Sequence, residues 1–391
     1  MSGRIIYLDN NATTQIAPEV REAMMPYLTD LYGNPSSMYS FAASAAAGLK
    51  EARAKVAALL GASPDEIVFT SCGTESDSTA ILSAIRTFPE KRHIITTRVE
   101  HPAVKNLCEN ISLFTGHKYR LTQLKVNEKG MLDLAEYEAA LGDDTAIVSV
   151  MWANNETGVV FPIAEMAKMA RKRGILFHTD AVQAVGKMPI NLAALDVDFL
   201  SLSGHKLHAP KGVGVLYVRK GSPFTPFLIG GHQERGRRGG TENAASIVGL
   251  GKASELAAAN METDNSRVRA LRDRLEEGLL ARIPKSILNG DKSHRLPNTC
   301  NISFEFVEGE SILLHMNQIG ICASSGSACT SGSLEPSHVL RAMGVPFTAA
   351  HGSIRFSLSV YNTEEEIDLV LGALPPIIAS LRALSPFWKE E

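Results

Sequence analysis

The sequence has few cysteines and no long apolar run, and each absence excludes a class of protein. Its five cysteines are spread over 391 residues, an odd and sparse set that differs from the disulfide framework of a small secreted domain. The first residues, MSGRIIYLDNNATT, contain neither an apolar core nor a small-residue cleavage site, so we expect no secretory signal. No stretch of about 18 uncharged apolar residues occurs, so we expect no membrane-spanning segment. These absences predict a soluble protein of the reducing cytoplasm.

The chain also lacks a large charge excess and the spacings of a metal site. Its 39 lysines and arginines nearly balance its 42 aspartates and glutamates, for a formal net charge of -3. This balance gives no bulk attraction to nucleic acid or to an anionic membrane. No CxxC pair or histidine-rich run is present, so we expect no metal. Hydrophobic residues make up 45% of the chain, which is enough for a large core, and the length predicts two domains.

The first two thirds of the chain alternate short apolar runs with amphipathic segments. The apolar runs are typical of buried strands and lie at 66–71, 93–99, 145–153, 174–180, 198–203 and 214–219. Segments between them, such as 76–88 and 163–174, have apolar residues at helical spacing. The alternation predicts an α/β fold whose mostly parallel sheet is covered on both faces. Ligands bind such sheets beyond the carboxyl ends of the strands.

From about residue 256 the pattern changes to that of a second, smaller domain. A charged helical segment at 266–283 precedes a strand at 296–307. A further strand at 353–359 is followed by a terminal helix. This order predicts an α+β domain.

Lys206 and Asp180 each follow a predicted strand, and together they indicate a cofactor with an aldehyde and a pyridine ring. A lysine within reach of an aldehyde forms a Schiff base when its ammonium is partly desolvated. A carboxylate can hold a pyridine nitrogen protonated, which the electron-sink chemistry of such a cofactor requires. Taken alone, Lys206 is more often an exposed loop residue, and Asp180 more often a helix cap or a metal ligand.

Three further features fit a phosphorylated planar cofactor. Gly73 and Thr74 open a predicted helix, where free backbone N–H groups and the helix dipole favour an anion, although an ordinary helix cap is the common alternative. Ser203 and His205 flank the lysine as possible phosphate donors. His101 follows another strand and could stack on a ring and transfer protons, or could be a packed histidine bonded to backbone.

Cys329 lies in the segment ASSGSACTSGSLEPS, residues 323–337, which consists almost wholly of small polar residues before Leu334. Such a segment buries little surface, so we expect an exposed, mobile loop and an accessible thiol that can ionise. A tolerated surface cysteine is the alternative. Cys322 lies in an apolar context and is interpreted as buried, with redox pairing as the alternative.

Arg355 and Thr241 are the remaining candidates. Arg355 lies in the strand SIRFSLS, and its planar fork suits a carboxylate, although on an alternating strand it could face solvent. Thr241 lies near the end of the basic stretch GHQERGRRGGTEN, residues 231–243. In a net-acidic chain this short cluster favours a phosphate or interface loop over a nucleic-acid patch.

Taken together, ten short sequence motifs are recognisable as a set. In order they are LDNNATT, GNPSS, TSCGTESDSTAILSA, VEHPAV, ANNETG, HTDAVQAVGK, SGHKLHAPKG, RRGGTENAASI, SSGSACTSGSLEPSHVLRAMG and SIRFSLS. The chain thereby resembles the cysteine desulfurases, which are class V aminotransferase-like pyridoxal-phosphate enzymes. The words SCGTESDST, VMWANNETG and GHQERGRRGGTENAASI are most similar to the nitrogen-fixation (NifS-like) branch.

The resemblance implies a fold and an assembly. The fold is that of the fold type I pyridoxal-phosphate-dependent transferases, with a large domain at 15–255 built on a mainly parallel seven-stranded sheet. A smaller α+β domain comprises 256–391 together with 1–14, and it carries the mobile cysteine loop. The protein would be a homodimer.

The resemblance also implies roles for individual residues. Lys206 would bind pyridoxal 5'-phosphate covalently, and Asp180 would pair with its ring nitrogen. Contacts to the phosphate would come from Gly73, Thr74, Ser203 and His205, and from Thr241 of the other subunit. Contacts to the ring oxygen would come from Asn154 and Gln183.

For catalysis, the resemblance implies that Arg355 holds the substrate carboxylate, with Asn154 beside it. The released Lys206 amine would remove the Cα proton, and the Cys329 thiolate would attack the substrate sulfur. His101 would handle thiol protons while stacked on the ring.

The implied function is a cysteine desulfurase that converts L-cysteine to L-alanine and holds the sulfur as a persulfide on Cys329. The sulfur would go to an iron–sulfur scaffold or another acceptor protein for cluster assembly, nitrogenase maturation included. The alternatives are a selenocysteine lyase or an aminotransferase of the same superfamily, or a non-catalytic sulfur carrier or scaffold. A scaffold would need none of Lys206, Asp180 and Arg355.

Overall fold

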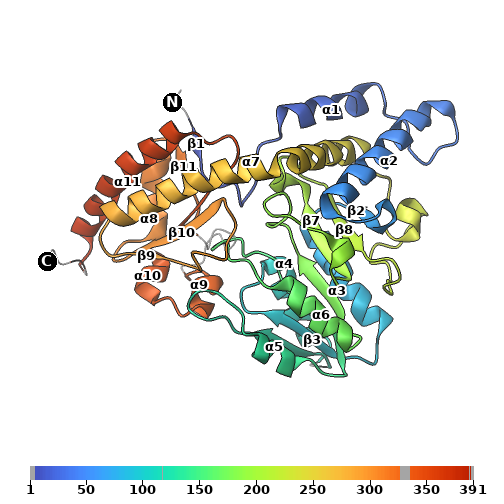
Figure 1. Ribbon diagram of the computed structural model, residues 1–391, viewed down its shortest axis with the longest axis horizontal. Helices are drawn as coiled ribbons and strands as arrows, with labels where there is room; N and C mark the ends of the chain where they lie inside the picture. Colours follow the sequence, from blue (N-terminus) through green and yellow to red (C-terminus); the bar gives the residue numbers. More distant parts are fainter. Residues whose placement is uncertain (1–4, 117, 326–334, 387, 389–391) are drawn as a thin grey trace.

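The protein has a large α/β part and a smaller α+β part, joined by one long helix (Figure 1). The structure is a computed structural model, and it describes residues 5–116, 118–325, 335–386 and 388. Three clusters of buried apolar side chains form its core, two on the faces of the larger sheet and one in the smaller part.

Among the described residues, seven strands form the larger sheet, and β8 is the strand that runs antiparallel to its neighbours. In sheet order they are β2 (Ile67–Thr70), β8 (Gly214–Val218), β7 (Phe199–Ser203), β6 (Leu176–Asp180), β5 (Thr145–Ser149), β3 (His93–Thr97) and β4 (Arg120–Leu124). The six predicted strands are all present. The parallel strands end at one edge of the sheet, so the residues that follow them gather there.

Side chains of each strand alternate between the two faces of this sheet, as the pleat requires. One face carries Val68, Ile94, Ile147, Leu176, Phe199 and Leu216. The other face carries Phe69, Ile95, Val148, Phe177, Leu200 and Val215. Because both faces are buried, the strands are almost continuously apolar, which is why they could be predicted.

Helices cover both faces of the large sheet. The face with Val68 packs against α3 (Gly73–Thr87) and α4 (Pro102–Phe114). The helices on or beside the other face are α1 (Pro18–Thr29), α2 (Ser40–Leu60), α5 (Leu134–Ala140), α6 (Ile163–Lys172) and the first part of α7 (Ala244–Arg282).

Strand β4 was missing from the sequence prediction because it is an edge strand. Arg120 is exposed, and Leu121, Thr122 and Gln123 are only half-buried. Its one ladder partner is β3. An edge strand of this kind has no continuous apolar run to identify it.

The smaller part contains two short sheets, as an α+β domain should. An antiparallel sheet has the order β12 (Ser353–Ser357), β10 (Thr299–Phe304) and β9 (Ser286–Leu288). Beside it, β1 (Ile6–Tyr7) pairs in parallel with β11 (Ile321–Cys322). The helices of this region are α8 (Gly309–Gln318), α9 (His338–Ala342), α10 (Phe347–His351) and α11 (Glu364–Leu384).

Helix α7 belongs to both parts. Ala253, near its start, packs in the core of the large part, and Val268 packs in the core of the small part. The predicted boundary at 255/256 therefore falls inside one continuous helix of 39 residues. We propose the two domains as 15–255 and 256–391 with 1–14, with α7 shared between them.

Within the described residues, α11 is the one helix long and apolar enough to cross a membrane by length and composition. Core helices meet the same criterion. In this protein Ile367, Leu374 and Ile378 of α11 are buried in the core of the small part.

A buried ion pair fastens α7 to the segment before β10. Arg295 Nη2 donates to Glu276 Oε1 at 2.8 Å, and the two side chains are 3% and 1% exposed. Two charges this deep are tolerated because each neutralises the other and shares hydrogen bonds with it.

We expect Arg295→Met to lower the unfolding free energy by about 3–5 kcal/mol, because it leaves the Glu276 carboxylate buried without its partner. Urea denaturation followed by circular dichroism would measure this loss. Arg295→Met combined with Glu276→Met removes both charges and should recover much of it. A single variant as stable as the parent would contradict the interpretation.

Candidate active site

A cavity of about 380 Å³ lies where the parallel strands end. Nine of the predicted site residues line it, namely Gly73, Thr74, His101, Asp180, Gln183, Ser203, His205, Lys206 and Arg355. They come from segments between positions 73 and 355 of the chain, so the fold brings together residues that are distant in sequence.

Lys206 lies in a short helical turn, Gly204–Lys206, directly after β7. Its Nζ donates to the backbone oxygens of Asn11, at 2.6 Å, and Ala12, at 2.7 Å. Both acceptors line the same cavity. The N-terminal segment that supplies them is fixed in place because the Thr14 N–H donates to the His205 oxygen at 3.0 Å. The sequence analysis gave Asn11 and Ala12 no role, although both lie in LDNNATT, one of the motifs that carry the family resemblance.

Asp180 is the last residue of β6 and is 6% exposed. Its Oδ1 accepts the Val182 N–H at 2.9 Å. Burial raises the pKa of this carboxyl, while the nearby His101 and Lys206 act in the opposite direction. A cationic ring nitrogen placed beside Asp180 would favour its charged form in the same way.

Asp77 is a buried carboxyl in this cavity that the sequence analysis missed. It lies on α3, with Oδ1 3.5 Å from His178 Nε2. Burial, and then the neighbouring Asp180, raise the pKa of Asp77 well above its usual value. This shift favours the neutral form of Asp77, whereas Asp180 has His101 and Lys206 near it, so Asp180 is the carboxyl better placed to pair with a cation.

An anion would find its donors at the start of α3. The N-cap residue Cys72 makes no side-chain cap bond, so the helix begins without the usual acceptor for its first N–H groups. A Cβ on Gly73 would lie 2.9 Å from Val182 Cγ2, so only glycine fits there. Ser203, the last residue of β7, and His205, two residues later, line the same cavity. Small residues, a helix N-terminus and hydroxyl and imidazole donors are what a phosphate requires.

His101 is the N-cap of α4, and its Nδ1 accepts the Ala103 N–H at 3.2 Å. The neutral ring therefore carries its proton on Nε2. Burial lowers the pKa of His101, and Lys206 lowers it further, while Asp180 opposes them. A neutral imidazole that lines the cavity can accept a proton near pH 7. His101 is bonded to backbone, as one of the alternatives weighed for it has it, and it also lines the cavity; stacking on a ring and proton transfer stay predictions.

Arg355 lies on β12 and is 6% exposed. Its Nη2 donates to Asp9 Oδ1 at 2.7 Å, and its Nη1 donates to the Asn155 oxygen at 3.1 Å. Among the described residues, Nε of Arg355 is buried without a hydrogen-bond partner. The guanidinium group is thus held at the cavity wall with one N–H unused, which suits recognition of a carboxylate. Asp9 was not predicted, because nothing in the sequence connects it to Arg355.

Gln183 and Asn154, the two predicted contacts of a ring oxygen, are placed differently. Gln183 lines the cavity and is 5% exposed. Asn154 is buried beside the cavity, with Nδ2 donating to the Val99 oxygen at 3.0 Å and Oδ1 accepting the Glu156 N–H at 2.9 Å. Its neighbour Asn155 lines the cavity instead. Contact between Asn154 and a cofactor or substrate stays a prediction.

Thr241 and Cys329 complete the predicted set. Thr241 is exposed and lines a different cavity, together with Thr70 and Arg238. Its own chain therefore does not bring it to Lys206. Cys329 lies outside the described residues.

The described residues fit the cofactor that the sequence predicts. Donors for a phosphate stand at the start of α3, a buried carboxyl at Asp180 suits a ring nitrogen, and Lys206 suits an aldehyde. Gly73 leaves room that any side chain would fill. Among the described residues, no group of three or more histidine, cysteine or acidic side chains could hold a metal ion.

Comparisons with known proteins agree with this chemistry. The family model described as aminotransferase class-V matches residues 6–370. A cysteine desulfurase of Trichormus azollae is 61% identical over 387 residues, which is 99% of this chain and 96% of that protein. The cysteine desulfurase NifS of Azotobacter vinelandii is 61% identical over 384 residues, covering 98% of this chain and 95% of that protein.

Solved structures give the same result. A NifS-like protein superposes with a TM-score of 0.90 at 38% identity, covering 97% of this chain and all 100% of that one. A NifS-like protein of Rickettsia africae superposes with a TM-score of 0.85 at 34% identity, covering 96% of this chain and 100% of that one.

Proposed function

Because this chain belongs to the class-V aminotransferase family and is a cysteine desulfurase, we propose that it converts L-cysteine to L-alanine and holds the sulfur as a persulfide on Cys329. The observation that carries this proposal is the convergence of Lys206, Asp180 and Arg355 on one cavity. Pyridoxal phosphate, the cofactor of this enzyme class, supplies an electron sink for the bond cleavages when it is bound. We propose that it is held by Lys206, by Asp180, and by donors from Gly73, Thr74, Ser203 and His205.

The substrate carboxylate would be bound by Arg355. Its ion pair with Asp9 fixes the guanidinium at the cavity wall, so the side chain loses little freedom when it binds a second carboxylate. Its spare Nε–H adds a donor. Asn154 would support the same end of the substrate from beside the cavity.

The amine of Lys206 would remove the Cα proton. The carbonyl oxygens of Asn11 and Ala12 accept from Nζ and hold the amine at the cavity wall, so it does not have to be ordered anew for each proton transfer. His101, which is neutral and has its Nδ1 occupied, would carry the proton exchanged with the thiols at Nε2.

Cys329 would be the sulfur acceptor. Ser324 lines the cavity, and its N–H donates to the Arg355 oxygen at 3.2 Å. Five residues of chain span at most about 17 Å, and Cys329 is five residues after Ser324. A thiol at that position can therefore reach both the substrate sulfur and a protein bound outside the cavity.

We further propose a homodimer in which Thr241 contacts the phosphate of the partner's site. Several large apolar side chains of the large part are exposed, among them Met25, Leu28, Met38 and Ile229. Exposed apolar side chains that gather on a surface mark protein–protein contacts. A second copy that covered some of them would account for a Thr241 that lines a cavity other than that of its own Lys206.

The persulfide would be passed to an iron–sulfur scaffold or another sulfur acceptor, for cluster assembly that includes nitrogenase maturation. A reducing cytoplasm suits this chemistry. The described cysteines, Cys72, Cys108, Cys300 and Cys322, are all free thiols.

The test is to incubate the purified protein with L-cysteine and a thiol reductant. We expect alanine and sulfide in equal amounts, because each turnover removes one sulfur from one cysteine and the reductant releases it. Alanine would be measured by chromatography and sulfide by a colorimetric assay. Parallel incubations separate the alternatives: with a 2-oxo acid added as amino acceptor, formation of 3-mercaptopyruvate from cysteine in place of alanine would identify an aminotransferase, and with selenocysteine added, turnover of selenocysteine but not of cysteine would identify a selenocysteine lyase. A protein that yields neither product would be a carrier or scaffold.

A further inference from the structure

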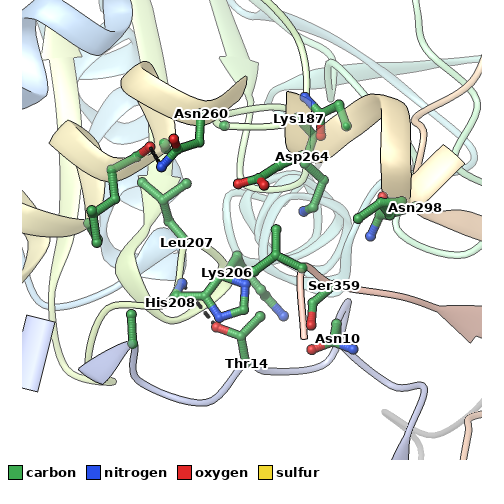
Figure 2. A pocket seen from close by; sticks show the side chains of 18 of the residues that line it. Asn10, Thr14, Lys187, Lys206, Leu207, His208, Asn260, Asp264, Asn298 and Ser359 are labelled. Carbon is green, nitrogen blue, oxygen red and sulfur yellow. Dashed lines mark hydrogen bonds between the residues drawn. The ribbon is translucent and has the colours of Figure 1, made fainter. Parts of the chain in front are cut away.

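A second cavity, of about 190 Å³, adjoins the candidate active site at Lys206, which lines both cavities. Figure 2 shows Lys187, Asp264 and Asn298 around the second cavity, with Lys206 and His208 at its wall. Two of these side chains bond to residues of the active-site cavity: Asn298 Nδ2 donates to Asn11 Oδ1 at 3.0 Å, and Lys187 bonds to Gln183.

A chain of hydrogen bonds runs from Lys187 to Lys206. Lys187 Nζ donates to Gln183 Oε1 at 3.2 Å and to the Gln183 backbone oxygen at 3.1 Å. Gln183 Nε2 donates to the Asn11 oxygen at 2.9 Å. That same oxygen accepts from Lys206 Nζ at 2.6 Å. Gln183 lies at the centre of this chain and lines the active-site cavity.

The two hydrogen-bond partners of the Gln183 side chain, Lys187 and Asn11, decide which way its amide faces. An amide can rotate by half a turn and exchange its oxygen and nitrogen at little cost unless its partners forbid it. The Lys187 amine has N–H groups to donate whether it is charged or neutral, and its charged form can only donate, so it favours the oxygen. The Asn11 carbonyl can only accept, so it requires the nitrogen. Of the two N–H groups on that nitrogen, one is bonded to Asn11 and the other is left for the active-site cavity.

We propose that Lys187 is a positioning residue for the reaction: by occupying Gln183 Oε1 from the second cavity, it keeps an N–H of Gln183 turned toward the ring oxygen of the cofactor. This inference rests on the proposed function, and specifically on Gln183 contacting that oxygen. A donor at the ring oxygen stabilises its anionic form and so lowers the affinity of the bound cofactor for its proton.

The surroundings of Lys187 agree with this role. Burial, and then the charge of Lys206, lower the pKa of Lys187 to about 7. A lysine side chain with no bonding role could extend its amine into solvent and avoid the free-energy cost of burying the charge. Lys187 instead keeps its amine at the two Gln183 oxygens, which shows that these bonds hold it.

The test is a pH titration of the cofactor's visible absorbance in the purified holoenzyme. We expect Lys187→Met to raise the midpoint by about one pH unit, since one lost hydrogen bond to a charged group changes proton affinity roughly tenfold. Lys187→Arg keeps a donor and a charge and should leave the midpoint near that of the parent. Lys187→Ala carries the same expectation as Lys187→Met, should the methionine side chain prevent folding.

A double-mutant cycle separates positioning from a through-space effect of charge. Gln183→Ala alone should raise the midpoint, and adding Lys187→Met to it should change the midpoint little further, because Lys187 acts through Gln183. Shifts that add in the double variant, or a Lys187→Met midpoint equal to that of the parent, would overturn the proposal. A parent protein with no visible cofactor band would instead contradict the proposed function, so the two failures are distinguishable.

Discussion

Replacing Lys206 by alanine should lower alanine formation from L-cysteine by more than about 1000-fold, because one side chain supplies both the covalent attachment of the cofactor and the base. The Asn11 and Ala12 carbonyls that accept from Nζ would remain, but carbonyls cannot remove a proton. The measurement is the rate of alanine formation at saturating substrate. Borohydride reduction followed by denaturation gives a second readout, since the parent should retain bound cofactor and Lys206→Ala should lose it.

Lys220 provides the matched control. It is an exposed lysine on the turn after β8 and lines none of the cavities described above. Lys220→Ala should form alanine at the parent rate and keep its cofactor through reduction and denaturation. A Lys206→Ala protein that still turned over cysteine within tenfold of the parent would require a different base.

The second large effect is expected at the sulfur acceptor. Cys329→Ser should retain the visible cofactor band but form sulfide at less than about 1% of the parent rate, because a serine hydroxyl stays protonated where a thiol with a pKa of about 8.5 is partly ionised. Sulfide release in the presence of reductant, and persulfide labelling of the protein without it, would both be measured.

Two other thiols sharpen this test. Cys322 on β11 is half-buried, and burial, followed by the charge of Asp9, raises the pKa of its thiol, so it is a poor nucleophile. Cys322→Ser should therefore react like the parent. Cys72 lines the active-site cavity and is the rival acceptor. Loss of sulfide in Cys72→Ala, together with a normal rate in Cys329→Ser, would assign the persulfide to Cys72.

The sequence predicted those parts of the fold that follow from local patterns. Strands buried on both faces have continuous apolar runs, so β6 and β7 could be found, along with Asp180 at the end of β6 and Lys206 beyond the end of β7. Strand β4, at the sheet edge, lacks such a run. The start of α3 was predictable because small residues stand there between an apolar strand and a helical pattern.

Contacts between distant segments could not be predicted in this way. The Arg355–Asp9 pair joins residues 346 positions apart, and the hold on Lys206 comes through backbone oxygens, which carry no sequence signal. Asn154 was identified from the motif ANNETG. In the structure its amide oxygen accepts the Glu156 N–H, and its neighbour Asn155 is the residue that lines the cavity, a difference that the motif does not reveal. The raised pKa of Asp77 likewise depends on burial that no local pattern reports.

The pairing of Asp9 with Arg355 has a consequence for the order of events during synthesis. A ribosome adds about 5–20 residues per second, so the 346 positions between the two partners take roughly 17–69 s to make. During that interval the large sheet can form while the N-terminal segment has no partner on β12. A nascent chain that stalls before residue 355 would thus carry the lysine and the phosphate donors but no arginine for the substrate, and it could bind the cofactor without being able to select an amino acid.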